Sequence, residues 1–270
     1  LEHCVIQGIE TNIDYVQTVL RTAAFQHGSI HTRYLNDLAY HPATVDVINP
    51  GTLTTIQDFP GRVGYWDVGV PPSGPFDCYS FQLGNRLLGN SNLAAGLEIT
   101  LNGPTLLFNH DAQFIITGAP IEATLDGTSI ANWQTISAQA GQTLILGKVD
   151  TAGARAYLLV SGGFDGNQYL GSRSTFTLGQ FGGFSGRALR SGDVLHLLQP
   201  NSTTADAGSK DALKEATPKL DDALKPAISN RWKLHVTYVP HGAPDFFTEK
   251  DIQSFFAHTW EVHYNSSRTG

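Results

Sequence analysis

Residues 105–130, TLLFNHDAQFIITGAPIEATLDGTSI, decide the fold class of this chain. Asp126-Gly127 predicts a tight hairpin turn that leads into Ser129-Ile130. Each apolar run before that turn has the length of a β-strand and is bounded by residues that favour turns. The stretch therefore predicts consecutive short strands joined by turns. The runs are Thr105–Phe108, Gln113–Thr117 and Ile121–Leu125.

The same pattern of short apolar runs extends over residues 45–200, where Gly, Pro, Asn and Asp separate the runs. Many short strands with frequent turns are typical of an all-β barrel or sandwich, so we expect a mainly-β fold. One helix interrupts the pattern, because Asp77 can cap its start and Gly89 stands where a glycine stop belongs. The further runs are Val45–Ile48, Thr143–Leu146, Ala156–Val160 and Val194–Leu198.

Two segments beside this β-rich region differ from it in composition. Residues 1–42 predict short α-helices, because Ile13, Val16 and Leu20 recur at helical spacing. Residues 201–230 contain no aromatic residue and alternate Lys with Asp or Glu. Such a segment buries little apolar surface, which predicts a linker or an exposed insertion.

Residues 231–270 begin a second module. Thr248-Glu249-Lys250-Asp251 predicts the start of a helix, because it resembles a capping box. The chain ends soon afterwards, so we expect this module to be truncated. The predicted domains are 1–42, 45–200, 201–230 and 231–270.

Composition excludes several classes of partner. The chain has 270 residues and a formal net charge of -7, with no basic stripe, which argues against nucleic acid or an anionic membrane. Its two cysteines, Cys4 and Cys78, suit neither a disulfide framework nor a metal pair, which favours a reducing, cytoplasmic compartment. The chain contains no Met, so we expect an excerpt of a longer protein.

Glycine clusters in the second half of the β-rich region suggest turns rather than a nucleotide site. Gly179–Arg187 lacks the Lys-Ser/Thr pair of a phosphate-binding loop, and Gly162-Gly163 has no GxGxxG frame. Both clusters favour tight turns or close backbone approach. Ser172-Arg173-Ser174 lies between them and can still line a pocket for an anionic ligand.

Two further segments combine polar residues with a restricted backbone. Residues 50–77 are rich in Gly and Pro, which restricts their path and leaves N–H groups free to meet a ligand. A structural Ω-type loop that caps a barrel end is an equal alternative. Residues 241–247 and 263–270 carry carboxylate, amide, imidazole and guanidinium groups. These groups can converge on a small polar molecule or stabilise turns.

These segments resemble the carboxyltransferase domain of the urea carboxylase family, the biotin-dependent half of urea amidolyases. The resemblance covers about residues 45–270, although Phe76 stands where the family usually has Met. Residues 1–42 resemble the C-terminal end of a biotin carboxylase domain, and this fusion favours urea as the substrate. The resemblance rests on TIQDFPGRVGYWDVGVPPSGPFD, NRLLGN, AAGLEITLNGP, YLGSRSTFTLGQFGG, HGAPDFFT and VHYNSSRTG.

The resemblance implies a cyclophilin-like β-barrel for each half of the carboxyltransferase domain. It also implies an ATP-dependent ligase that moves a carboxyl group from carboxybiotin to urea to give allophanate. Biotin on its carrier domain, and ATP with Mg at the biotin carboxylase domain, would lie outside this chain. Expected partners are urea, those two domains of the same polypeptide and a second copy in a homo-oligomer. The alternatives are another amide such as 5-oxoproline, or a KipA-type regulatory binding module.

Site residues follow from the substrate and the family-like motifs. Urea offers one carbonyl acceptor and four N–H donors, so its site needs a donor and several acceptors. We expect Asn265 and Arg268 as donors and Asp245 as an acceptor in catalysis, without a metal ion. The expected substrate-binding residues are His241, Tyr264, Ser73, Gln57 and Arg173.

Overall fold

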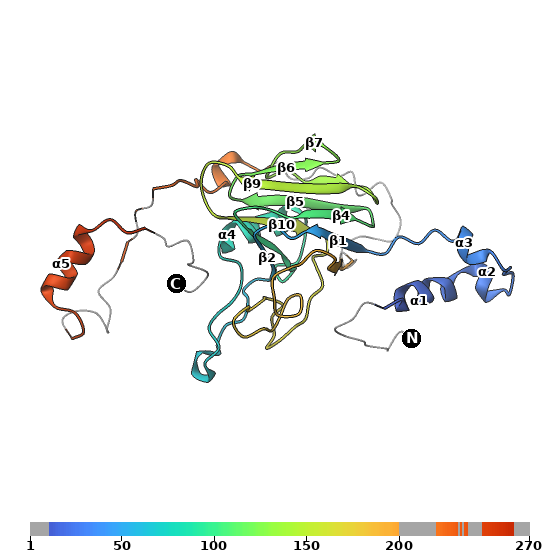
Figure 1. The fold of residues 1–270 in the computed structure, drawn as a ribbon, viewed down its shortest axis with the longest axis horizontal. Helices are drawn as coiled ribbons and strands as arrows, with labels where there is room; N and C mark the ends of the chain where they lie inside the picture. Colours follow the sequence, from blue (N-terminus) through green and yellow to red (C-terminus); the bar gives the residue numbers. More distant parts are fainter. Residues whose placement is uncertain (1–10, 200–219, 232, 234, 237–244, 262–270) are drawn as a thin grey trace. The chain divides into compact units, whose positions relative to one another are not determined.

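The computed structural model describes residues 11–199, 220–231, 233, 235–236 and 245–261 (Figure 1). The chain divides into two compact units, Leu1–Ile228 and Ser229–Gly270. The first unit holds every described β-strand, and each unit is treated separately below.

Six strands of the first unit form one antiparallel sheet in the order β11-β1-β4-β9-β6-β7. The Asp126-Gly127 hairpin is confirmed, because β6 pairs with β7 across it. The strands are β1 (Thr44–Asn49), β4 (Thr105–Phe108), β6 (Ile121–Leu125), β7 (Thr128–Ser129), β9 (Thr143–Val149) and β11 (Val194–His196).

Five strands form a second antiparallel sheet in the order β2-β3-β10-β5-β8. The mainly-β prediction is therefore confirmed, with two sheets layered on one another (Figure 1). The strands are β2 (Leu53–Gln57), β3 (Gly96–Thr100), β5 (Ala112–Gly118), β8 (Ile136–Ala138) and β10 (Arg155–Val160).

The core lies between the two sheets. Val47 and Leu106 come from the six-stranded sheet, and Leu97 and Leu158 come from the five-stranded sheet; none of the four is exposed to solvent. The rings of Phe108 and Phe114, one from each sheet, stack with their centroids 5.5 Å apart. Burying each such side chain contributes about 1.5–3 kcal/mol, so this layer is the main source of stability.

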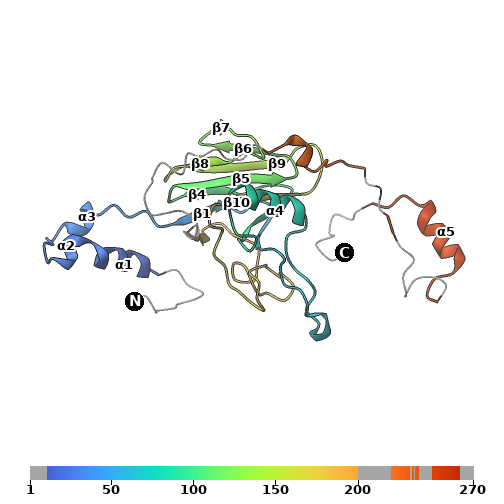
Figure 2. The same ribbon diagram turned by 180° about the vertical axis from the view of Figure 1, so that it is seen from behind.

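Helix α4 (Cys78–Leu87) covers part of the outer face of the five-stranded sheet, against β5 and β10 (Figure 2). Phe81 meets Tyr157 edge to face, with ring centroids 5.6 Å apart. The predicted cap is confirmed, because the Asp77 carboxylate accepts a hydrogen bond from the Ser80 N–H at 3.0 Å. Gly89 follows the helix with φ of +69°, as expected of a glycine stop.

Strand β2 corrects the interpretation of residues 50–77 as a loop, and β3 is a strand that the apolar runs did not predict. Thr54, Thr55 and Gln57 are polar, and Glu98 interrupts the apolar run of β3. The structure buries all four side chains. The buried polar side chains therefore interrupt the apolar pattern by which the sequence predicts strands.

The predicted N-terminal helices are present as α1 (Ile13–Arg21), α2 (Ala23–Gln26) and α3 (Tyr34–Asp37). Two 3₁₀-helices, η1 (Trp66–Val68) and η3 (Asp222–Leu224), lie in connecting segments. None of the described helices combines the length and the apolar character that crossing a bilayer requires.

The end of the predicted linker packs against the β-rich region. The Tyr79 hydroxyl donates a hydrogen bond to the Leu224 carbonyl at 2.8 Å. Ile228 packs, partly buried, against the core. Residues 200–219 lie outside the described part of the chain.

In the second unit, the structure describes helix α5 (Glu249–Ala257). Its capping box is confirmed: the Thr248 N–H donates to the Asp251 carboxylate at 2.9 Å, and the Asp251 N–H donates to the Thr248 hydroxyl at 3.3 Å. The hydrogen bonds from Thr248 hold the pKa of Asp251 below its ordinary value.

Replacing Asp77 with Ala should loosen the first turn of α4, because the N-cap acceptor is lost. Loss of such a cap costs about 1 kcal/mol, so we expect roughly fivefold faster amide hydrogen exchange in this turn. Peptide-level exchange on the complete protein measures this. Asp150→Ala, at an exposed aspartate, is the matched control. Identical exchange in the two variants would contradict the capping role.

Candidate functional site

The outer face of the five-stranded sheet is polar where β2, β3 and β10 run side by side. Thr55 on β2 pairs with Glu98 on β3, and Glu98 pairs with Tyr157 on β10. Because side chains alternate along a strand, these three share one face, while their chain neighbours point into the core. This row of polar side chains is the base of the candidate site.

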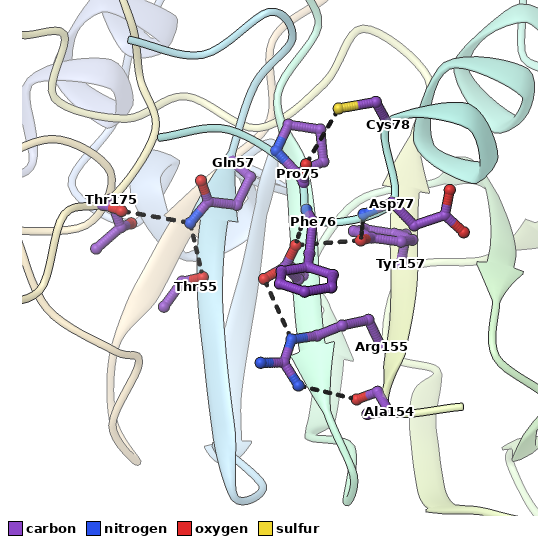
Figure 3. A network of polar contacts seen from close by, with 11 residues as sticks. Thr55, Gln57, Pro75, Phe76, Asp77, Cys78, Ala154, Arg155, Tyr157 and Thr175 are labelled. Atoms are coloured by element: carbon purple, nitrogen blue, oxygen red, sulfur yellow. Dashed lines mark hydrogen bonds and ion pairs between the residues drawn. The ribbon is translucent and has the colours of Figure 1, made fainter. Parts of the chain in front are cut away.

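Glu98 is the buried carboxylate at the centre of this row, only 3% exposed. Its Oε2 accepts hydrogen bonds from the Phe76 N–H at 2.7 Å and from the Tyr157 hydroxyl at 3.1 Å. The Arg155 Nε lies 3.6 Å from its Oε1. Figure 3 shows Phe76, Arg155 and Tyr157 grouped in this way. The contact with Phe76 N–H attaches the segment before α4 to the sheet.

Tyr157 extends the same network to α4. Its hydroxyl oxygen accepts a hydrogen bond from the Asp77 N–H at 2.6 Å. Burial, together with the negative charge of Glu98, raises the pKa of the Tyr157 hydroxyl far above its ordinary value. The hydroxyl therefore stays protonated and acts as a hydrogen-bond donor to Glu98.

Arg62 joins the loop after β2 to the loop after β10, and both loops leave the same side of the sheets (Figures 1 and 2). Its guanidinium, only 1% exposed, donates to the Tyr169 carbonyl at 2.9 Å and to the Ser174 carbonyl at 3.0 Å. It also donates to the Ser73 hydroxyl at 3.0 Å. Burial lowers the pKa of Arg62, and the nearby charge of Asp58 opposes that shift.

Asp58 holds the same two loops from the other side. Its carboxylate accepts hydrogen bonds from the hydroxyls of Ser172 and Ser174, at 2.5 and 2.6 Å, and from the Arg173 N–H at 2.7 Å. The two serine hydroxyls are therefore committed to Asp58. Of the Ser172-Arg173-Ser174 group, this leaves only the Arg173 side chain available to a ligand.

Gln57 carries a buried acceptor without a donor. Its amide nitrogen donates to the Thr55 hydroxyl at 3.0 Å and to the Thr175 carbonyl at 3.4 Å. Its Oε1 is buried and has no hydrogen-bond partner among the described residues (Figure 3). Leaving a buried polar group unpaired costs about 1–3 kcal/mol, so this oxygen is suited to accept an N–H from a ligand.

The structure places the three expected binding residues of the first unit at the end of β2 and on the two joined loops. The Ser73 hydroxyl accepts from Arg62, the Arg173 backbone N–H donates to Asp58, and Gln57 directly precedes Asp58. The Arg173 Nε also lies 3.5 Å from an Asp165 carboxylate oxygen. Of the five expected residues of the second unit, Asp245 lies in an exposed turn. The other four, His241, Tyr264, Asn265 and Arg268, lie outside the described residues.

Sequence reasoning missed the residues that organise the site. Glu98 and Tyr157 were detectable in principle, because each is a polar residue inside an otherwise apolar strand. Asp58 and Arg62 stand in a loop and carried no such signal. Within the described ranges, no group of three or more His, Cys, Asp or Glu side chains could hold a metal ion.

Comparison with known proteins places this two-sheet β-domain in a family. Residues 68–270 match the family described as carboxyltransferase domain, subdomain A and B, and the chain belongs to it. The chain is 44% identical over 272 residues to the urea amidolyase of Saccharomyces cerevisiae. That alignment covers all of this chain but only 14% of the yeast protein.

Two further comparisons bear on the substrate. The crystal structure of Kluyveromyces lactis urea carboxylase superposes with a TM-score of 0.85 at 43% identity, over 96% of this chain and 23% of that one. One subunit of the 5-oxoprolinase of Haemophilus influenzae is 30% identical over 226 residues, covering 84% of this chain and 67% of that protein.

Replacing Tyr157 with Phe should release the segment before α4, because the Asp77 N–H and Glu98 each lose a buried partner. We expect a loss of about 1–3 kcal/mol, seen as faster hydrogen exchange around residues 76–81. Tyr65→Phe is the control, since the Tyr65 hydroxyl makes no hydrogen bond to a described residue.

The raised pKa of Tyr157 predicts a second effect of the same substitution. An unfolded tyrosine loses its proton near pH 10, whereas folded Tyr157 keeps it. The stabilisation by this group is therefore complete below about pH 10 and falls as the pH rises further, by up to about 1.4 kcal/mol per pH unit. Stability of Tyr157→Phe should decline less steeply in alkali. Equal slopes for Tyr157→Phe and the unsubstituted protein would contradict this.

Proposed function

We propose that this chain is part of a biotin-dependent urea carboxylase, in which it contributes to the transfer of a carboxyl group from carboxybiotin to urea, giving allophanate. The observation that carries the proposal is the alignment with yeast urea amidolyase at 44% identity along the whole chain. The superposition on K. lactis urea carboxylase supports the same substrate.

The extent of the alignments favours urea over 5-oxoproline. The amidolyase alignment includes the whole chain, whereas the alignment with the 5-oxoprolinase subunit covers 84% of it at lower identity. A carboxyltransferase acting on another amide, or a KipA-type binding module, is the alternative.

We assign residues 1–42 to the C-terminal end of a biotin carboxylase domain and residues 45–200 to the first carboxyltransferase subdomain. Residues 201–230 are the linker or insertion, and residues 231–270 begin the second subdomain. The chain spans 14% of the yeast relative. In this proposal, the biotin carrier and the ATP- and Mg-binding carboxylase body belong to the rest of the polypeptide.

The described residues support the proposal with some of the hydrogen-bonding groups that urea requires. Gln57 offers a buried carbonyl without a donor, which suits an N–H of urea. Ser73 and Arg173 lie on the two loops that Arg62 and Asp58 join. The ureido ring of biotin carries the same carbonyl and N–H groups as urea, so these residues also fit the cofactor, which supplies the carboxyl group when it is bound.

The proposal also keeps the catalytic and binding roles that the family-like motifs suggested for residues 241–268. Asn265 and Arg268 donate to the urea oxygen, and Asp245 accepts from a urea nitrogen. His241 and Tyr264 complete the substrate contacts. Orientation of the reactants provides most of the rate, since holding two groups in line removes a large entropic barrier.

Bicarbonate-dependent ATP hydrolysis by the complete protein tests the substrate. Urea should stimulate it more than acetamide or 5-oxoproline does. Greater stimulation by 5-oxoproline would transfer the assignment to that substrate. Absence of stimulation by any of the three would favour the binding-module alternative.

Replacing Gln57 with Leu should raise the KM for urea about tenfold, because the acceptor for one urea N–H is lost. Asn265→Ala should reduce urea-stimulated turnover by a similar factor or more. Steady-state kinetics with varied urea measure both effects. Gln82→Leu, on the surface of α4, is the matched control and should behave like the unsubstituted protein. An unchanged KM in Gln57→Leu would contradict the proposed role of Gln57 in urea binding.

A further inference from the structure

A hollow of about 430 Å³ lies on the glycine-rich segment between β10 and β11, where the sequence indicated only tight turns. Its polar lining comes from Thr177, Gln180, Ser185, Arg187 and Arg190. None of these residues takes part in the contacts of Glu98, Arg62 or Asp58 described above. The hollow is therefore a separate feature from the candidate carboxyltransferase site.

The segment that forms the hollow is attached to β2 at both ends. The Thr175 N–H donates to the Ile56 carbonyl, and the Leu189 N–H donates to the Thr54 carbonyl, each at 2.9 Å. Within the segment, a Cβ added to Gly186 would lie 2.0 Å from the carbonyl carbon of Gln180. The two turns thus pack backbone against backbone, which fixes the positions from which their exposed side chains extend.

Two side chains of the lining stand on a strained backbone. Gln180 and Ser185 have φ of +56° and +53°, the left-handed region that residues other than glycine rarely occupy. Such strain persists where the surrounding structure enforces it, and it concentrates at ligand sites. Here both strained residues line the same hollow, although glycine would satisfy either turn at lower cost.

The hollow also holds an unbalanced positive charge. Arg187 forms a two-point ion pair with Asp193, with both N–O distances 2.8 Å. Arg190 donates only its backbone N–H to the same carboxylate, at 2.7 Å. The Arg190 guanidinium pairs with no carboxylate in the described part of the chain. Asp193 therefore pairs with the charge of Arg187 alone, and the exposed Arg190 side chain lines the hollow without a carboxylate partner among the described residues.

We propose that this hollow binds a small organic carboxylate. The Arg190 guanidinium presents paired N–H donors that match the two carboxylate oxygens. The hydroxyls of Thr177 and Ser185 and the Gln180 amide add further donors. Leu53 and Ala188 provide an apolar wall for a short hydrocarbon stem. This inference is independent of the urea carboxylase proposal and would stand if that proposal failed.

Isothermal titration calorimetry of the complete protein tests this with butyrate, its neutral isostere butyramide and inorganic phosphate. Butyrate should bind at least about tenfold more tightly than butyramide, since charge-assisted hydrogen bonds to Arg190 are lost in the amide. Equal affinities for the two would overturn the proposal, as would absence of butyrate binding. Tighter binding of phosphate than of butyrate would contradict the proposal that the ligand is an organic carboxylate.

Substitutions in the lining test whether butyrate binds in this hollow. Arg190→Gln should weaken butyrate binding at least about tenfold, and Arg190→Lys should weaken it less, because one ammonium replaces a paired donor. Ser185→Gly removes a hydroxyl while relieving the left-handed strain, so it should weaken binding without loss of thermal stability. Arg86→Gln, an exposed arginine of α4, is the charge-matched control and should bind like the unsubstituted protein. Unchanged binding in Arg190→Gln would overturn the assignment.

Discussion

The buried guanidinium of Arg62 is the contact on which the rest of the candidate site depends. It joins two loops whose contact residues stand 107 to 112 positions apart in the sequence. A charge removed from water is costly unless its donors are all used, so neither loop reaches its position without the other. The aromatic rings of Tyr169 and Phe181 lie near the guanidinium, with the Phe181 centroid 4.7 Å from its central carbon.

The two buried carboxylates of the site each accept a hydrogen bond from the backbone of a loop. Glu98 accepts the Phe76 N–H and attaches a loop backbone to the sheet, whereas Asp58 accepts the Arg173 N–H and attaches one loop backbone to another. Loops held in this way have little freedom, which suits a site that must orient two reactants. Among the described residues, this network leaves one buried side-chain acceptor without a donor, the Gln57 carbonyl.

The comparisons and the geometry address different parts of the functional question. The comparisons show a carboxyltransferase domain that is similar along its whole length to a urea amidolyase, whereas the polar contacts show which buried groups of the first unit have partners and which do not. The hollow at Arg190 differs in kind, because its charge is uncompensated and its lining is strained. The long connection between β10 and β11 thus contributes both to the polar face, through residues 169–175, and to the proposed anion-binding hollow, through residues 177–190.

Local chemistry alone determined much of this protein. Short apolar runs such as Thr105–Phe108, the Asp126-Gly127 turn and the cap at Asp77 depend on neighbouring residues, so the sequence predicts them. Strands β2 and β3 were missed, because Gln57 and Glu98 are polar and become buried only when distant loops cover them. The same holds for Asp58 and Arg62, since the Ser172 hydroxyl and the Tyr169 carbonyl that they contact lie more than 100 positions away. Tertiary structure decided those contacts, since no local pattern records which distant group will satisfy a buried charge.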